Sequence, residues 1–175
     1  MVMAKKKRSS KCYKHLERPY TRRSKYRKKS FVKSAPNLRT VKFDMGAVSS
    51  EFPKRVSLFT LQDMQIMDNC LESARQTANK LLIDKLGRKG FHFKIKVFPH
   101  HILRYNPIAM GAGADRLSTG MQKSFGKPIG RAARVRAGQE LMYIEVAENG
   151  IENAKQALKK AGHKLPVKVF INITR

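Results

Sequence analysis

The chain has 175 residues, and its 38 Lys or Arg against 12 Asp or Glu give a formal net charge of +26. Such a charge repels other copies of the chain and attracts polyanions, above all nucleic acid, because each neutralised phosphate releases counterions. No apolar run approaches the roughly 18 residues of a membrane span, and the two cysteines form no disulfide framework. We therefore expect a cytoplasmic protein that has no membrane partner and forms no homo-oligomer.

The first 35 residues are predicted to form a basic arm. Residues 1–33 hold fourteen Lys or Arg and a single acid, Glu17, and so carry half of the net charge. Tyrosines among cations suit RNA, since rings stack on bases while Lys and Arg neutralise phosphates. We predict an RNA-binding arm that orders only when bound; the alternative is a disordered tail for targeting or solubility. The predicted RNA-binding residues of the arm are Lys5, Lys6, Lys7, Arg8, Lys11, Tyr13, Lys14, Arg18, Tyr20, Arg22, Arg23, Lys25, Tyr26, Arg27, Lys28 and Lys29.

Residues 36–175 are predicted to be a single α+β domain. Strands with alternating apolar residues and two helices with apolar stripes follow one another without βαβ regularity, so we expect mostly antiparallel pairing. The expected strands cover residues 38–43, 55–59, 91–98, 102–105, 133–136 and 139–147, with a last strand from Pro166. The expected helices cover residues 60–86 and 150–161, capped at Thr60 and Asn149 and ended by Gly87 and Gly162.

The strand over residues 91–98 shows the clearest alternation. Its odd-numbered residues are apolar and are expected to face the core. Its even-numbered polar residues are expected to present charge outward; they are His92, Lys94 and Lys96.

The stretch from Asn106 to Gly130 connects two strands and holds five of the eleven glycines. Apolar residues at i, i+4 and i+8 from Leu117 predict a helix over residues 115–125, capped by Asp115 and ended by Gly126, which leaves a mobile glycine-containing tip before it. We predict a finger that reaches into nucleic acid; a disordered surface loop is the alternative. Basic residues on and around the inserted loop 105–130 are expected to bind RNA: Arg104, Arg116, Lys123, Lys127, Arg131, Arg134 and Arg136. All of these except Arg116 are expected to form a rim at the base of the finger.

Motifs for catalysis, metals and nucleotides are incomplete in this sequence. Cys12-x-x-His15 is half of a zinc site without a second pair of ligands. His100-His101 has no accompanying nucleophile or carboxylate cluster, so we interpret both side chains as surface or RNA-facing. The glycines of the loop lack the spacing of both nucleotide-binding motifs. We expect no catalytic residue, no metal and no cofactor.

The loop also carries a resemblance to a known family. The sequence AGADRLSTGMQKSFGKPIG at residues 112–130, followed by Ala133-Arg-Val135, is similar to the signature of the universal L-sixteen family of the large ribosomal subunit, in its archaeal and eukaryotic form (older name L-ten-e). Shorter blocks resemble the family in collinear order: Cys12-Tyr13, Pro19-Tyr20, Phe43-Asp44, Glu51-Phe52-Pro53, Ala78-Asn79-Lys80 and Gly90-Phe91-His92. The arm after Tyr20 has more bases than the family pattern, and the longer C-terminal tail of eukaryotic members is missing, which indicates an archaeal source.

This resemblance implies a small β-barrel or sandwich flanked by two helices, in a structural and non-enzymatic constituent of the large ribosomal subunit. Members bind large-subunit rRNA between the central protuberance and the peptidyl-transferase centre, lie beside neighbouring ribosomal proteins and join late in assembly, with the 5S rRNA region as a further candidate contact. They shape the corridor through which aminoacyl-tRNA is accommodated. The residues implied to approach tRNA are Tyr105, Asn106, Pro107, Ile108, Ala109, Met110, Gly111, Ala112, Gly113 and Ala114.

Two other functions are compatible with the composition. A nucleoid-type protein would bind duplex DNA, but one specific loop on a large mixed core is untypical of a simple packing arm. An RNA-modifying enzyme would require a cofactor loop or an acid–base pair, and the sequence displays neither.

Overall fold

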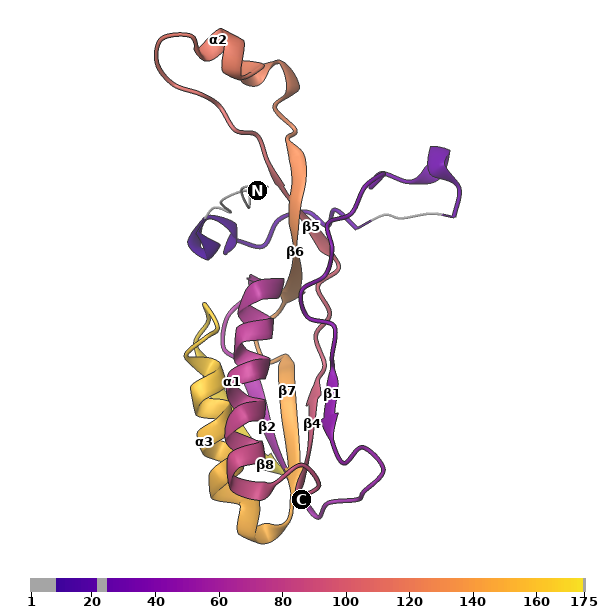
Figure 1. Cartoon of the computed structure of the whole chain (residues 1–175), viewed down its shortest axis with the longest axis vertical. Coiled ribbons are helices and arrows are strands. Elements are labelled where there is room, and N and C mark those ends of the chain that lie inside the picture. Colours follow the sequence, from indigo (N-terminus) through magenta and orange to yellow (C-terminus); the bar gives the residue numbers. More distant parts are fainter. Residues whose placement is uncertain (1–8, 22–24, 175) are drawn as a thin grey trace.

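Two antiparallel sheets form the body of the protein in the computed structural model, which describes residues 9–21 and 25–174 (Figure 1). In the larger sheet the strands follow the order β1 (Asp44–Gly46), β4 (Phe91–Ile95), β7 (Glu140–Val146), β2 (Lys54–Thr60) and β8 (Val169–Thr174). In the smaller sheet the order is β3 (Met64–Met67), β6 (Lys127–Val135) and β5 (His101–Tyr105).

Helices α1 (Asp68–Leu86) and α3 (Ile151–Gly162) lie side by side over one face of the larger sheet (Figure 1). A third helix, α2 (Ala114–Leu117), is far from them at the end of the finger. Short 3-10 turns complete the elements: η1 (Ser10–Tyr13), η2 (Arg27–Lys29), η3 (Gly120–Lys123) and η4 (Glu148–Gly150). The α+β class with antiparallel pairing is confirmed. Neither sheet closes on itself in the described part of the chain, so the barrel or sandwich detail is not confirmed.

The main core lies between the larger sheet and the two long helices. The odd-numbered residues Phe91, Phe93 and Ile95 of β4 are buried there, together with Met142 and Ile144 of the neighbouring β7. The alternation predicted for β4 is therefore correct on its apolar side. On the other side His92 faces away from this core, as predicted, but it is not solvated: it is buried between two carboxylates, with Nδ1 2.8 Å from Glu145 Oε2.

The long helix α1 begins eight residues later than the sequence pattern indicates. Residues 64–67 pair with β6 as strand β3, and all four are buried, so long-range pairing overrides their helical spacing. In the first turn of α1 a free backbone N–H is bonded by Asp68 and not by Thr60: the N–H of Asn69 donates to Asp68 Oδ1 at 2.9 Å. The predicted end is confirmed: Gly87 has φ +72° and donates its N–H to the carbonyl of Ile83.

Residues 38–43 do not form the predicted strand. The backbone N–H of Arg39 donates to Asp68 Oδ2 at 3.3 Å, and Thr40 Oγ1 donates to the Asp68 carbonyl at 3.0 Å. These bonds hold the segment against the start of α1, and strand pairing begins only at Asp44. The last strand likewise begins at Val169 and not at Pro166.

The second predicted helix is present, and both of its predicted ends lie within one residue of the observed ones, but the predicted cap is wrong. α3 begins at Ile151 after the 3-10 turn η4, and Asn149 provides no side-chain cap. Gly162 is the last helical residue, so the predicted end is close to the observed one.

Candidate nucleic-acid interface

A finger, residues 106–130, projects from the smaller sheet at the opposite end of the molecule from the C-terminus (Figure 1). Strands β5 and β6 form its base, where Tyr105 pairs with Lys127. Instead of the single predicted helix over residues 115–125, the finger holds the short helix α2 and the turn η3, separated by extended Ser118. Asp115 is not a cap, since Gly113 occupies the position before the helix.

Hydrogen bonds tie the two sides of the finger together. Asn106 Nδ2 donates to the Gly120 carbonyl at 3.1 Å, and the Ala109 N–H donates to Ser118 Oγ at 3.3 Å. At the base, Gly126 has φ +77°, and a Cβ there would lie 2.8 Å from the carbonyl carbon of Tyr105. The two strands therefore approach each other as closely as glycine permits.

The end of the finger exposes apolar side chains. Met110 is 96% exposed, and Ile108, Leu117 and Met121 are also exposed. The helical spacing of Leu117 and Met121 therefore does not reflect a packed face of this chain. A contiguous exposed apolar patch is typical of interaction sites, so the end of the finger is a candidate for one.

An aromatic clamp, which we define as Tyr20, Arg104 and Phe125, joins the arm to the finger. Cζ of Arg104 lies 4.6 Å from the ring centroid of Tyr20 and 4.2 Å from that of Phe125. The two rings meet edge to face, with centroids 5.3 Å apart. A cation over an aromatic face is stabilised by about 0.5–1 kcal/mol at exposed sites. Arg104 thus binds protein groups, although its residue type predicted a role in RNA binding.

The arm also covers both free edges of the smaller sheet. On the β3 edge the backbone N–H of Gln65 donates to the Lys14 carbonyl at 3.0 Å, and on the β5 edge the N–H of Ile102 donates to the Tyr20 carbonyl at 3.2 Å. Tyr13 is buried in an apolar cluster with Met67, Leu103 and Ala132. Its ring cannot stack on a base without leaving this cluster.

His101 is buried where the arm meets β5, and not at the surface as predicted. Its Nδ1 accepts from the backbone N–H of Tyr20 at 3.0 Å, so the neutral ring carries its proton on Nε2. Nε2 lies 3.9 Å from Glu17 Oε2. Burial lowers the pKa of His101; Glu17 opposes this shift, and the guanidinium groups of Arg134 and Arg104 add to it.

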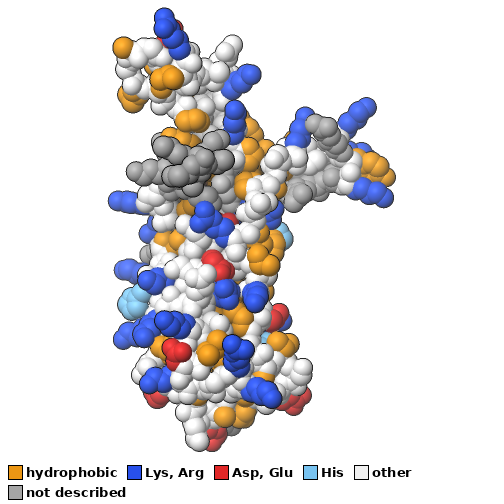
Figure 2. Space-filling model, in the orientation of Figure 1, with side chains coloured by type: hydrophobic (Ala, Val, Ile, Leu, Met, Phe, Trp, Pro, Cys, Tyr) orange, Lys and Arg blue, Asp and Glu red, His pale blue; other side chains and the backbone are white. Residues whose placement is uncertain are grey.

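Acidic residues are scarce in the arm and finger. Residues 1–33 and the finger together contain seventeen Lys or Arg but only two acids, Glu17 and Asp115. On the face shown in Figure 2, Lys and Arg occur from end to end, while Asp and Glu lie mainly over the body. The potential that attracts a polyanion is therefore concentrated at the arm and finger.

The outer face of the larger sheet, turned away from α1 and α3, has paired charges. Glu140 accepts from Arg55 Nη2 and from Lys96 Nζ, both at 2.6 Å. Burial raises the pKa of Glu140, but hydrogen bonds from Lys96, Ser57 and Arg55 outweigh it and hold the pKa below its usual value. Arg55 also lies over the Tyr143 ring, 3.7 Å from its centroid. Cations that are satisfied by carboxylates here are poor candidates for phosphate binding.

The structure separates the predicted RNA-binding residues into groups. Tyr13 and Arg104 are used within the protein, and so is Arg131, whose Nε donates to the Pro36 carbonyl at 2.7 Å. Lys14 and Tyr20 are partly exposed. The exposed group comprises Lys11, Arg18, Lys25, Tyr26, Lys28, Lys29, Arg116, Lys123, Lys127, Arg134 and Arg136. Lys5, Lys6, Lys7, Arg8, Arg22, Arg23 and the side chain of Arg27 lie outside the described residues.

The predicted rim is spread along β6 and is not one ring. Arg104, Lys127 and Arg131 lie on the paired strands at the base of the finger. Arg134 is near the other end of β6, where it pairs with Gln65 of β3. Arg116, which was predicted to bind RNA but not as part of the rim, is in α2. The basic side chains therefore form a line from the body to the end of the finger.

Residues 9–21 and 25–174 contain no group of three or more His, Cys, Asp or Glu that could hold a metal ion. None of the helices in these ranges has the length and apolar content needed to cross a membrane. Cys12, half of the incomplete zinc motif, is exposed.

Three residues at the interface have roles that the sequence pattern does not indicate. Phe125 was assigned to a helix face but packs on Arg104, and Glu17 lies within 4.0 Å of the same guanidinium. His101 binds the arm. The lone acid in a basic block was the available signal for Glu17. The role of His101 depends on Tyr20, 81 residues away in sequence, and that of Phe125 on a contact with Arg104 across the finger.

Comparison with known proteins identifies the family. The model of the family described as ribosomal protein L16p/L10e matches residues 21–172. The chain is 41% identical over 169 residues to the large ribosomal subunit protein uL16 of Archaeoglobus fulgidus, covering 97% of this chain and 94% of the relative. It is 43% identical to that of Methanococcus aeolicus, covering 95% and 93%, and 44% identical to that of Thermofilum pendens, covering 91% and 92%.

These matches confirm the resemblance found in the loop, and the prediction that the protein is no enzyme. The matched region includes the finger, both sheets and both long helices. The chain therefore belongs to the ribosomal protein L16p/L10e family, whose members are structural proteins.

Proposed function

We propose that this protein is a structural constituent of the large ribosomal subunit that binds rRNA through its arm and the basic line along β6 and the finger. Its relatives bear the name large ribosomal subunit protein uL16. The observation that carries the proposal is the separation of charge: seventeen bases and two acids in the arm and finger, against paired charges on the outer face of the larger sheet. Such a concentration of cations suits the neutralisation of closely packed phosphates.

We further propose that the finger extends towards tRNA near the peptidyl-transferase centre and helps to shape the corridor for aminoacyl-tRNA. Residues 105–114 carry the contact, with α2 and η3 as their support. The exposed tip, its cross-strand hydrogen bonds and its single acid support this assignment. We also propose that the protein lies beside neighbouring ribosomal proteins and the 5S rRNA region. It joins the subunit at a late step of assembly.

Sedimentation of tagged protein from cell lysate tests the proposal. The protein should migrate with the large subunit through sucrose and remain there after a high-salt wash, because a buried set of phosphate contacts is screened less than exposed charges. Digestion with RNase should release it, while DNase should not. Migration with genomic DNA, or as free protein, would contradict the ribosomal assignment and favour a nucleoid-type protein.

A further inference from the structure

The larger sheet ends at strand β8, whose outer edge has no partner strand within the described residues. Its six residues, Val-Phe-Ile-Asn-Ile-Thr, contain no charge, proline or glycine. β-Branched and aromatic residues favour strand pairing, and an unprotected edge of this composition pairs readily with another chain. Natural proteins usually protect such an edge with charges, proline or a covering segment.

The other sheet edges in the described part of the chain are covered or short. The arm bonds to β3 through Lys14 and to β5 through Tyr20. The remaining edge strand, β1, has only three residues. The long uncovered edge of β8 therefore stands out as the place where an additional strand fits.

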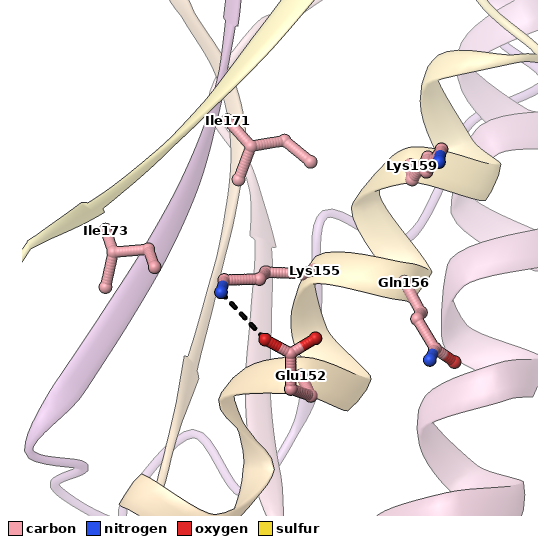
Figure 3. A pocket seen from close by; sticks show the side chains of 6 residues that line it. All are labelled: Glu152, Lys155, Gln156, Lys159, Ile171 and Ile173. Atoms are coloured by element: carbon pink, nitrogen blue, oxygen red, sulfur yellow. Dashed lines mark hydrogen bonds and ion pairs between the residues drawn. The ribbon is translucent and has the colours of Figure 1, made fainter.

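A shallow groove of about 400 Å³ runs between β8 and α3 (Figure 3). Ile171 and Ile173 point from the strand towards the helix, and Lys155 points from the helix towards the strand. Lys155 is paired with Glu152 at 2.8 Å, whereas no ion pair within the described residues holds Lys159. The two isoleucines form an apolar surface and Lys159 places a cation beside it. Such a groove suits a peptide in which an apolar side chain lies near an acidic one.

We propose that the edge of β8 and this groove bind an extended segment of a neighbouring ribosomal protein by strand addition. Backbone groups of the segment pair with β8, an apolar side chain packs on Ile171 and Ile173, and an Asp or Glu faces Lys159. This inference rests on the proposed function, since the partner is a protein of the same subunit. A second copy of the chain is repelled by its charge of +26, and RNA offers neither a strand nor an apolar complement to the isoleucines.

Site-specific photo-crosslinking in purified large subunits tests this proposal. A diazirine-bearing aliphatic amino acid is placed at Ile173, and the matched control carries it at Ile83 on α1; the two isoleucines are 43% and 36% exposed. Mass spectrometry of the Ile173 product should identify an extended peptide that contains Asp or Glu from another ribosomal protein. A crosslink to rRNA, to a second copy of this chain, or a yield no higher than at Ile83 would overturn the proposal.

Charge reversal provides a second measurement. Lys159→Glu should lower the crosslinking yield at Ile173 by roughly two- to fivefold, the change expected for loss of one exposed ion pair. Lys160→Glu is the control, because Lys160 is exposed on the same helix but does not line the groove. Equal yields in the two variants would contradict the assigned acidic contact. Absence of the chain from salt-washed subunits would refute the proposed function, whereas presence without a protein crosslink would refute the β8 site.

Discussion

At the scale of single residues, Arg104 and His101 connect the arm to the base of the finger. Arg104 stacks on Tyr20 and Phe125, and His101 accepts the Tyr20 N–H, so both side chains act on the same segment of the arm. Tyr20 of the arm is therefore held by residues of the same chain. If this segment moves when the arm binds RNA, the contacts of Arg104 with Tyr20 and Phe125 at the base of the finger change as well.

Replacing Arg104 by Leu should loosen the finger. The variant loses the cation that contacts two rings, and with it about 1–2 kcal/mol of the free energy that opposes local opening of the finger. Hydrogen exchange of the backbone amides in residues 106–130 should therefore be roughly 5- to 30-fold faster. Arg104→Lys should retain part of the protection, because a cation remains. Arg116→Leu, at an exposed site in α2, is the control and should leave exchange unchanged. Equal exchange in Arg104→Leu and the unmodified protein would show that the clamp does not hold the finger.

Stability should fall in mild acid because of His101. Its pKa is lowered in the folded state, so the unfolded chain takes up the proton first, near pH 6.5. Below that pH the free energy of unfolding should decrease by up to about 1.4 kcal/mol per pH unit until the folded pKa is reached. Protonation of Nδ1 removes the acceptor for the Tyr20 N–H.

Denaturant unfolding between pH 7.5 and pH 5 measures this effect. His101→Gln lacks the titrating ring and serves as the reference for the other four histidines. The unmodified protein should show a steeper loss of stability than the variant below pH 6.5. Parallel pH profiles would mean that the arm contact does not depend on the protonation of His101.

At the scale of elements, the finger depends on a close approach of its two strands. Gly126 and Gly120 both have positive φ, +77° and +56°, but their surroundings differ. Backbone atoms of Tyr105 and Asn106 surround the position of a Cβ at Gly126, whereas nothing lies within 4 Å of one at Gly120. The pair separates the effect of backbone conformation from that of steric contact.

Gly126→Ala should disturb the finger more than Gly120→Ala. Both variants incur roughly 1–2 kcal/mol for a left-handed non-glycine residue, but only Gly126→Ala must also displace the backbone of Tyr105. We expect chemical-shift changes along β5 and β6 in the first variant and changes confined to η3 in the second. Similar spectra for the two variants would contradict the tight base.

At the scale of the whole molecule, the arm is part of the fold as well as of the charged surface. It covers both edges of the smaller sheet and places Tyr13 beside Met67, Leu103 and Ala132. A simple division into an RNA-bound arm and an independent domain therefore omits the contribution of residues 13–20 to stability. The same segment links the two regions that we propose to bind RNA.

Deleting residues 1–21 should destabilise the free protein. Removal of Tyr13 from its apolar cluster alone corresponds to about 1.5–3 kcal/mol, and the two sheet edges become uncovered. Deletion of residues 1–8 is the control, since it removes four cations but leaves Tyr13, Lys14 and Tyr20 in place. Equal unfolding midpoints for the two deletions in urea would show that the arm contributes nothing to the fold.

The class of the protein, its family and most of its core were predictable from local features of the sequence. Net charge, the loop signature and the period-two pattern of β4 are local properties of the chain, and each was confirmed or supported. The apolar stripe from Leu71 to Leu82 and the end of α1 at Gly87 are local in the same way. These features require only neighbouring residues and the direction of the core.

The partners of the remaining residues depend on contacts between segments that are distant in the sequence. Residues 64–67 form a strand because β6 pairs with them, and His101 is buried because Tyr20, 81 residues away in sequence, donates to it. Arg104 contacts the rings of Tyr20 and Phe125 because the arm and the finger fold back onto β5. Local propensity contributes only a few tenths of a kcal/mol per residue, which is less than the contribution of a hydrogen bond or of burial between distant segments. The spacing of residues in the sequence therefore does not reveal these contacts.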